Sequence, residues 1–185
     1  TLAYISDNAS SIKDKNIRIS SNLSLLHFTK DSYVTEVEKI VETFKPSIFN
    51  CLDIEITEYN NFTARIIKNI NTLIRNYKDK IQFHLDDVYS INGFTSVDII
   101  TRTSIDKIKL DREILTSAKS RKAILKIMSG IKMFADNYGT GIICEGVETK
   151  AHESILKEVG IKEAQGYLYS RPIPLNECKD KYLRG

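Results

Sequence analysis

Strand-like segments and helical segments follow one another along this chain from end to end. Alternating apolar residues mark strands near 17–20, 52–58, 81–87, 105–111, 141–145 and 161–165. Amphipathic helical segments separate them, and two of these helices are expected to end at Gly139 and Gly160. Further helices are expected at both ends of the chain, over 2–12 and 175–183. Strands that alternate with helices form mainly parallel sheets, so the pattern predicts an α/β protein.

Two α/β architectures fit this order. Polar residues at the C-terminal ends of the strands suit a TIM-like (β/α)8 barrel, and a doubly wound open sheet is the alternative. About six βα units are present, which is two fewer than a closed barrel has. We therefore expect a barrel that is incomplete at its N-terminus, with its first units upstream of Thr1. No linker-like segment divides the sequence, so residues 1–185 are expected to form a single, N-terminally truncated domain.

Composition fits one globular domain and argues against several functions. The 185 residues are 42% hydrophobic and 28% charged, which is enough apolar material for a core. The net charge is only +3, and no basic cluster is interleaved with aromatic residues, so no DNA or RNA partner is expected. No stretch approaches the roughly 18 apolar residues of a membrane span. The three cysteines are far apart, which indicates reduced thiols in a cytoplasmic protein.

Most of the predicted strands end in side chains that could bind a metal or assist catalysis. In a barrel these ends converge on one face, where active sites form. Carboxylate and amide oxygens favour Mg²⁺ or Mn²⁺ over Zn²⁺, and paired ions of this kind assist phosphoryl displacement. Any one of these residues alone could equally cap a helix or lie in a solvated loop, so their joint occurrence carries the prediction. The residues are Asn22, Glu55, Asp86, Asp87, Lys109, Asp111, Glu145 and Gln165.

The same residues lie in motifs that resemble one family, the EAL domains that hydrolyse cyclic di-GMP. The motifs are N-L-S at 22–24, E-I-T-E at 55–58, D-D at 86–87, K-L-D at 109–111, E-G-V-E-T at 145–149, and Q-G-Y followed by S-R-P at 165–172. Their order and approximate spacing agree with the family over essentially the whole chain. The last two motifs are highly specific in combination. The chain is therefore identified as a member of this family.

The resemblance implies a role for each of these positions. Two divalent cations, Mg²⁺ or Mn²⁺, are expected, with Asp86 contributing to both. Glu58 would support the loop after Asp87 and would not bind metal directly. Lys109 and Glu145 would hold or activate the attacking water, and Gln165 would complete the site. The expected metal ligands are Asn22, Glu55, Asp86 and Asp87, and the expected catalytic residues are Lys109, Glu145 and Gln165.

Two departures from the family pattern bear on activity. The E-x-L-x-R segment, which supplies a metal-binding glutamate and a phosphate-binding arginine, is missing from the chain and is expected upstream of Thr1. The family's D-D-F-G-T-G loop reads D-D-V-Y-S-I-N-G over 86–93, and the stretch to Lys109 is about two residues longer than usual. We therefore expect the 185-residue chain alone to hydrolyse cyclic di-GMP poorly or not at all.

Two functions follow from the resemblance. One is divalent-metal-dependent hydrolysis of cyclic di-GMP to linear pGpG in bacterial second-messenger signalling. The alternative is a catalytically inactive EAL domain that acts as a cyclic di-GMP receptor or a protein-interaction module. The family also implies a cytoplasmic location, a homodimer, and sensor or GGDEF domains upstream. An upstream region could anchor the full-length protein to a membrane.

Overall fold

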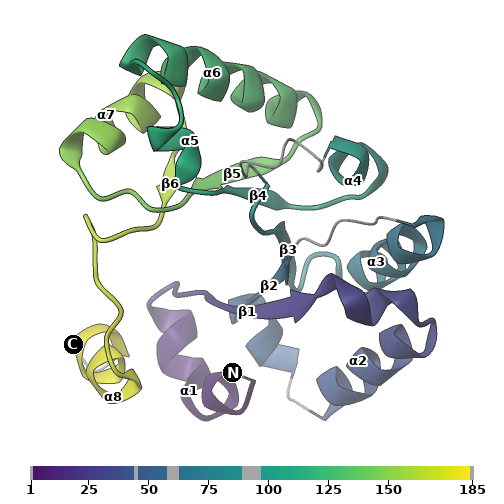
Figure 1. Ribbon diagram of the computed structural model, residues 1–185. Helices are drawn as coiled ribbons and strands as arrows, with labels where there is room; N and C mark the ends of the chain where they lie inside the picture. The colour runs from purple at the N-terminus through teal and green to yellow at the C-terminus, as the bar shows by residue number, and fades with distance from the viewer. Residues whose placement is uncertain (1, 44–45, 58–62, 89–96, 184–185) are drawn as a thin grey trace. The chain divides into compact units, whose positions relative to one another are not determined.

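The computed structural model describes residues 2–43, 46–57, 63–88 and 97–183 of the chain (Figure 1). The chain divides into two compact units. The first comprises residues 1–83 and 172–185, and the second comprises residues 84–171. Both units contain parallel strands connected through helices, as the alternating sequence pattern predicts.

The first unit contains a pair of parallel strands and the helices that follow them. In chain order the elements are α1 (Leu2–Asp14), β1 (Ile19–Ser24), the 3₁₀ turn η1 (Leu25–Thr29), α2 (Ser32–Glu42), the 3₁₀ turn η2 (Pro46–Cys51), β2 (Leu52–Thr57) and α3 (Ala64–Tyr77). The C-terminal α8 (Leu175–Cys178) and the π-helical turn η3 (Lys179–Leu183) belong to the same unit.

Strand β2 is buried along almost its whole length, although it carries two carboxylates. Strands of a parallel sheet that is covered on both faces are usually apolar throughout, so buried charges in them need partners. Arg18 is the partner of Asp53: its Nε lies 2.6 Å from the carboxylate oxygen. The same guanidinium donates to the carbonyl oxygens of Asn50 and Leu52, at 2.6 and 2.8 Å. Arg18 therefore joins the start of β1 to the start of β2.

Helix α3 packs an apolar stripe that includes Ile66 and Ile70 into the core of the first unit. Thr63 caps its N-terminus by accepting a hydrogen bond from the amide of Ile66 at 3.3 Å. Asn69 interrupts the stripe, yet it is only 4% exposed. Its amide donates to the carbonyl of Phe28 at 2.9 Å, which fastens α3 to the end of η1.

The second unit contains four parallel strands in the order β3-β4-β5-β6. Strand β3 crosses the boundary between the units: Gln82 and Phe83 are assigned to the first unit, and His84 and Leu85 to the second. Helices α6 and α7 contact each other alongside these strands (Figure 1). The elements are β3 (Gln82–Leu85), α4 (Val97–Arg102), β4 (Lys107–Leu110), α5 (Glu113–Thr116), α6 (Arg121–Asn137), β5 (Gly141–Cys144), α7 (Lys150–Val159) and β6 (Glu163–Ala164).

The helix boundaries in the second unit follow from local chemistry. Ser120 caps α6 by accepting from the amide of Ala123 at 3.2 Å. Thr149 caps α7 by accepting from the amide of His152 at 3.1 Å. Helix α7 ends at Gly160, which has a φ of 84°, a left-handed conformation that glycine adopts at little cost. The predicted end at Gly160 is therefore confirmed.

A salt bridge links two strands across the strand that lies between them. Lys107 on β4 reaches Glu163 on β6, with the Nζ atom 2.6 Å from a carboxylate oxygen. Gly141 on β5 lies beneath this side chain, and a β-carbon at that position would be 3.0 Å from the Cγ of Lys107. The missing side chain at Gly141 therefore leaves room for the bridge.

Some predicted boundaries and packing differ from the structure. The first predicted strand, 17–20, is observed as β1 at Ile19–Ser24, so Asn22 lies within the strand. At the start of α4, Val97 is 37% exposed, whereas Ile100 is 2% exposed. The predicted closing helix divides into α8 and η3. In the described part of the chain, no helix has the length and apolar character needed to cross a membrane.

Candidate active site

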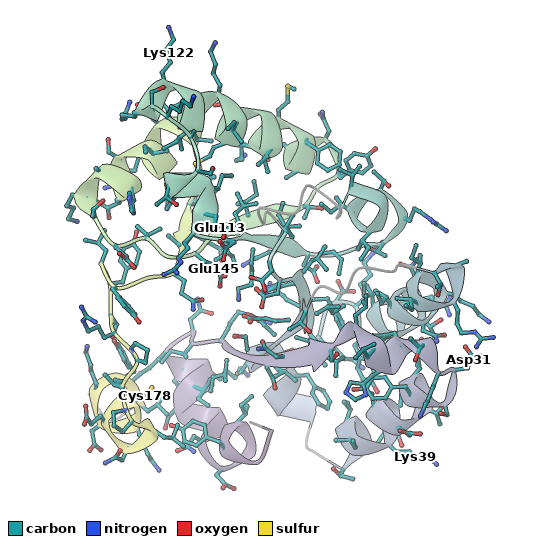
Figure 2. All side chains as sticks on the ribbon, in the orientation of Figure 1. Asp31, Lys39, Glu113, Lys122, Glu145 and Cys178 are labelled. Carbon is teal, nitrogen blue, oxygen red and sulfur yellow. The ribbon has the colours of Figure 1, made fainter. Side chains whose placement is uncertain are left out.

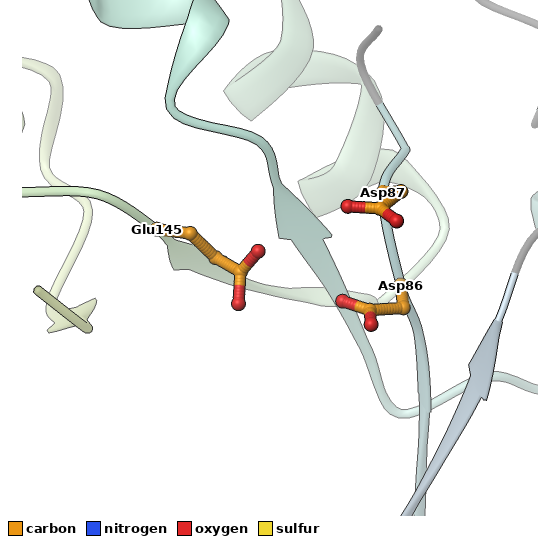
Figure 3. Close-up of side chains that lie close together, drawn as sticks. All are labelled: Asp86, Asp87 and Glu145. Atoms are coloured by element: carbon orange, nitrogen blue, oxygen red, sulfur yellow. The ribbon is translucent and has the colours of Figure 1, made fainter. Parts of the chain in front are cut away.

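Three carboxylates gather in the second unit at the C-terminal ends of β3 and β5. Asp86 and Asp87 follow β3 directly, and Glu145 follows β5 directly. Each offers an oxygen atom, and these atoms lie within 4.8 Å of one another. Figure 3 shows the side chain of Glu145 extending toward the two aspartates. The sequence prediction that these strand-end carboxylates come together is confirmed for these three residues.

Lys109 on β4 lies between two of these carboxylates. Its Nζ atom is 2.9 Å from Asp86 and 2.8 Å from Glu145. The lysine side chain is 5% exposed, and those of Asp86 and Glu145 are 13% and 19% exposed. Ion pairs with so little solvent access are weakly screened, so each partner strongly affects the charge of the others. A single ammonium group therefore holds together residues that follow two different strands.

The carboxyl group of Glu145 has a raised pKa. Burial is the largest cause, and the charges of Asp86 and Asp87 raise the pKa further. The hydrogen bond and charge of Lys109 act in the opposite direction but do not cancel these effects. The cluster is thus short of positive charge when it holds no cation. Hard oxygen donors with a deficit of positive charge fit Mg²⁺ or Mn²⁺.

Backbone hydrogen bonds continue past the strand ends and fix the segments that carry these groups. The amide of Val88 donates to the carbonyl of Lys109 at 3.0 Å, and the amide of Glu145 donates to Leu110 at 2.9 Å. The amide of Gln165 donates to the carbonyl of Cys144 at 2.8 Å. Glu145 and Gln165 are therefore held by sheet-like bonds although they lie outside the strands.

Two glycines allow the segments after β4, β5 and β6 to approach closely. A β-carbon on Gly146 would lie 2.2 Å from the Cβ of Arg112, and the φ of Gly146 is 59°. A β-carbon on Gly166 would lie 2.4 Å from the backbone nitrogen and oxygen of Val147. Distances under 3.0 Å are not tolerated without movement. Glycine is therefore required directly after both Glu145 and Gln165.

A cleft of about 250 Å³ opens beside Glu145. Gln165 and the ring of Tyr167 line it, and Tyr167 is 52% exposed. The guanidinium of Arg171 lies 4.6 Å from the centre of that ring, a cation–π contact. The lining residues are Asp111, Arg112, Glu145, Gly146, Glu148, Gln165, Gly166 and Tyr167.

Not every predicted site residue lies in this cluster. Asn22 and Glu55 belong to the first unit, where they are register partners on β1 and β2. Asn22 is exposed, and Glu55 is 9% exposed. Their role as metal ligands stays a prediction. Glu58 lies outside the described residues, as do positions 89–93 of the altered loop.

Sequence reasoning missed Arg112 as part of the site. This residue directly follows the K-L-D motif, and its neighbour Asp111 accepts a hydrogen bond from the amide of Glu113 at 2.7 Å, which starts α5. Hydrophobic periodicity did not indicate α5, because the helix has only four residues. Figure 2 shows Glu113 and Glu145 in the same region of the second unit. The signal that could have identified Arg112 was its position in the sequence, directly after Asp111 of the K-L-D motif.

The chain belongs to the EAL domain family, whose model matches residues 1–172. It is 26% identical over 177 residues to the cyclic di-GMP phosphodiesterase PdeR of Escherichia coli, an alignment that covers 93% of this chain and 25% of PdeR. A crystal structure of an EAL domain protein from Listeria monocytogenes superposes with a TM-score of 0.77 at 25% identity, covering 98% of this chain and 72% of that chain.

A complex of Klebsiella pneumoniae BlrP1 with manganese and cyclic di-GMP is also similar in fold. Its TM-score is 0.69 at 24% identity, and the match covers 92% of this chain and 42% of that chain. The predicted family and the α/β barrel-type fold are confirmed by these matches. The chain spans a quarter or less of the length of PdeR and two similar curated relatives.

Proposed function

We propose that this chain carries the hydrolytic site of a divalent-metal-dependent cyclic di-GMP phosphodiesterase that produces linear pGpG. The observation that carries the proposal is the contact of Lys109 with both Asp86 and Glu145, at 2.9 and 2.8 Å. A lysine and a carboxylate held together in this way can orient a water molecule and accept its proton. The name of the relative PdeR and the family match support the choice of substrate.

The chemistry follows from the structure of the product. Because pGpG carries its terminal phosphate on a 5′ oxygen, the water oxygen bonds to phosphorus and the P–O3′ bond breaks. Glu145 takes a proton from the water, and the departing 3′ oxygen takes up a proton from solvent and leaves as a hydroxyl group. Bound Mg²⁺ or Mn²⁺ would lower the pKa of the water and neutralise charge on the phosphate. Lys109 keeps the Glu145 carboxylate oriented toward that water.

The donor set proposed for the metal has two parts. Asp86 and Asp87 offer carboxylate oxygens next to Glu145. The family resemblance adds Asn22 and Glu55, and two ions is the number it implies. Equilibrium dialysis with Mn²⁺ tests this: replacing Asp86, Asp87, Glu55 or Asn22 with alanine should each weaken metal binding at least tenfold. Alanine at Glu158, which pairs with Arg121 on the surface, should leave metal binding unchanged.

The decisive experiment is a product assay. The protein, made with its natural flanking sequence, is incubated with cyclic di-GMP and Mg²⁺ or Mn²⁺, and pGpG is measured by chromatography. We expect product from the unmodified protein and none from Glu145→Ala, while Glu158→Ala serves as the matched control. A chelator should abolish the reaction.

A receptor without catalysis is the second candidate, because the D-D-V-Y-S-I-N-G segment departs from the family's D-D-F-G-T-G loop. In that case the same assay gives no pGpG while cyclic di-GMP still binds. If the protein neither forms pGpG nor binds cyclic di-GMP, the remaining function that the family resemblance suggests is interaction with another protein. A single domain, a homodimer and further upstream domains remain predictions for the whole protein.

A further inference from the structure

The cleft beside Glu145 contains a cationic residue, Arg112, that the proposed reaction does not use. The cleft is lined by three carboxylates, those of Asp111, Glu145 and Glu148. Arg112 is the one cationic side chain among the described residues that line it. All of these residues belong to the second unit. A ligand that carries phosphate enters a strongly acidic cleft at this point, so a cation in the lining has a direct electrostatic consequence.

The position of Arg112 is fixed at its base. Its backbone precedes α5 with φ −53° and ψ −24°, and its carbonyl accepts a hydrogen bond from the amide of Leu115 at 3.0 Å. Its β-carbon lies against Gly146, where any side chain would collide with it. The arginine side chain therefore starts directly beside the backbone of Gly146, the residue after Glu145, and Arg112 is exposed to solvent.

The guanidinium of Arg112 makes no ion pair or side-chain hydrogen bond within the part of the chain that the structure describes. Three other cations of the second unit have carboxylate partners. Lys109 is 5% exposed and contacts two carboxylates, Lys107 contacts Glu163, and Arg121 contacts Glu158. Lys109 is buried against the two carboxylates that it contacts, whereas the side chain of Arg112 is exposed and makes no such contact.

We infer that Arg112 binds a phosphate group of the cyclic dinucleotide in this cleft. The inference rests on the proposed function. A guanidinium is planar and can donate two parallel hydrogen bonds to two phosphate oxygens. A volume of about 250 Å³ is below the range of pockets that enclose a whole ligand, so the cleft takes one part of the dinucleotide. A phosphate is the part whose charge the acidic lining would otherwise repel.

The experiment measures binding of a hydrolysis-resistant bisphosphorothioate analogue of cyclic di-GMP in the presence of Mn²⁺. The protein carries its natural flanking sequence. Arg112→Ala should weaken binding roughly tenfold to a hundredfold, the range expected for a lost charged hydrogen bond. Arg112→Lys should recover only part of the affinity, since an ammonium group still attracts the phosphate as a point charge but cannot donate the two parallel hydrogen bonds. Arg121→Ala, which removes the same charge from the surface of the same unit, should bind as the unmodified protein does.

Salt dependence and a base-only competitor sharpen the assignment. Affinity of the unmodified protein should fall more steeply with NaCl than that of Arg112→Ala, because one phosphate contact is lost in the variant. Guanosine, which has no phosphate, should compete weakly for the site, and equally so in the unmodified protein and in Arg112→Ala. If Arg112→Lys is as weak as Arg112→Ala and guanosine loses affinity for both variants, the arginine reads the base, and the phosphate assignment is overturned.

The outcomes separate this inference from the proposed function. Equal affinity of Arg112→Ala and the unmodified protein overturns the role of Arg112 and leaves the phosphodiesterase proposal standing. No binding to the unmodified protein overturns both. Since Arg112 is exposed, its variants should fold normally, and circular dichroism confirms that before binding is compared.

Discussion

The two units hold their buried charges in different ways. In the first unit, the carboxylate of Asp53 is paired with Arg18, whose remaining hydrogen bonds go to backbone carbonyls. In the second unit, Lys109 contacts two carboxylates and a third lies close by. The first arrangement is balanced and joins two strands. The second has more negative than positive charge, and this surplus is what a site for cations requires. A charge imbalance therefore distinguishes the candidate site from a structural ion pair.

Replacing Lys109, the positively charged residue of the carboxylate cluster, should have the largest effect on stability and activity. Lys109→Met leaves the carboxylates of Asp86 and Glu145 without a partner. We expect the free energy of unfolding of the metal-free protein to fall by about 2 kcal/mol. This is less than the usual cost of breaking a buried ion pair, because the two carboxylates retain some solvent contact. Hydrolysis should fall about a thousandfold. Urea denaturation in a chelator and the pGpG assay measure the two effects.

Lys107→Met is the matched control for this variant. It removes a lysine two positions earlier on the same strand, whose partner Glu163 is 50% exposed. Its cost should stay within about 1 kcal/mol, with activity unchanged. Added Mn²⁺ should restore the stability of Lys109→Met, because a cation replaces the lost charge, but it should not restore activity. If the two lysine variants behave alike, the surplus charge has no special role.

A glycine substitution should affect the site without touching a charge. Gly166→Ala places a β-carbon 2.4 Å from the backbone of Val147, so the segment that carries Gln165 must move. We expect a drop in hydrolysis of about a hundredfold, since small displacements of catalytic groups have effects of this size. Gly160→Ala is the control: it shares a positive φ, but nothing lies within 4 Å of its β-carbon. It should cost about 1 kcal/mol of stability and leave kcat unchanged.

The raised pKa of Glu145 predicts a pH dependence of stability. The folded protein holds the Glu145 proton more tightly than the unfolded chain does, because burial raises its pKa. This contribution to stability is present below the ordinary carboxyl range near 4.5 and is lost as pH rises through the raised pKa. Metal-free protein should therefore lose stability over this interval, and Glu145→Gln should remove that part of the slope.

Glu153 provides a control of opposite sign. Hydrogen bonds from Lys150 and then Lys157 lower the pKa of Glu153, so its contribution is present above the ordinary range and is lost as pH falls. Glu153→Gln should make the protein relatively less stable at higher pH. Urea midpoints measured in a chelator between pH 4 and 7 compare the two. Parallel curves for the Glu145 variant and the unmodified protein would contradict the assignment.

The buried thiols test whether the two units unfold as one domain. Cys51 lies in the first unit and Cys144 in the second, and they are 2% and 0% exposed. Burial, with added effects from Glu145 and Asp111, raises the pKa of Cys144 to about 12. Only Cys178 should react with a thiol reagent in the native protein. Both buried thiols should become reactive at the same urea concentration, and two separate midpoints would contradict the predicted single domain.

The sequence predicted the repeating elements better than the irregular ones. Hydrophobic periodicity and glycine at helix ends located α6 and α7 closely, because these signals lie within each segment. Asp86, Asp87, Lys109 and Glu145 were predicted from their positions at strand ends, and the structure brings them together. Asn69 and Arg112 were missed, since their importance depends on contacts with Phe28 and Gly146 that are distant in the sequence.

The backbone hydrogen bonds beyond the strand ends have a consequence for local motion. The amides of Glu145 and Gln165 can exchange with deuterium only when bonds of 2.9 and 2.8 Å to neighbouring segments open. They should therefore exchange slowly, like core amides, although both side chains lie outside the strands. The protection of these two amides would give the opening free energy of the site itself. It would show whether this part of the molecule opens on its own or only when the whole domain unfolds.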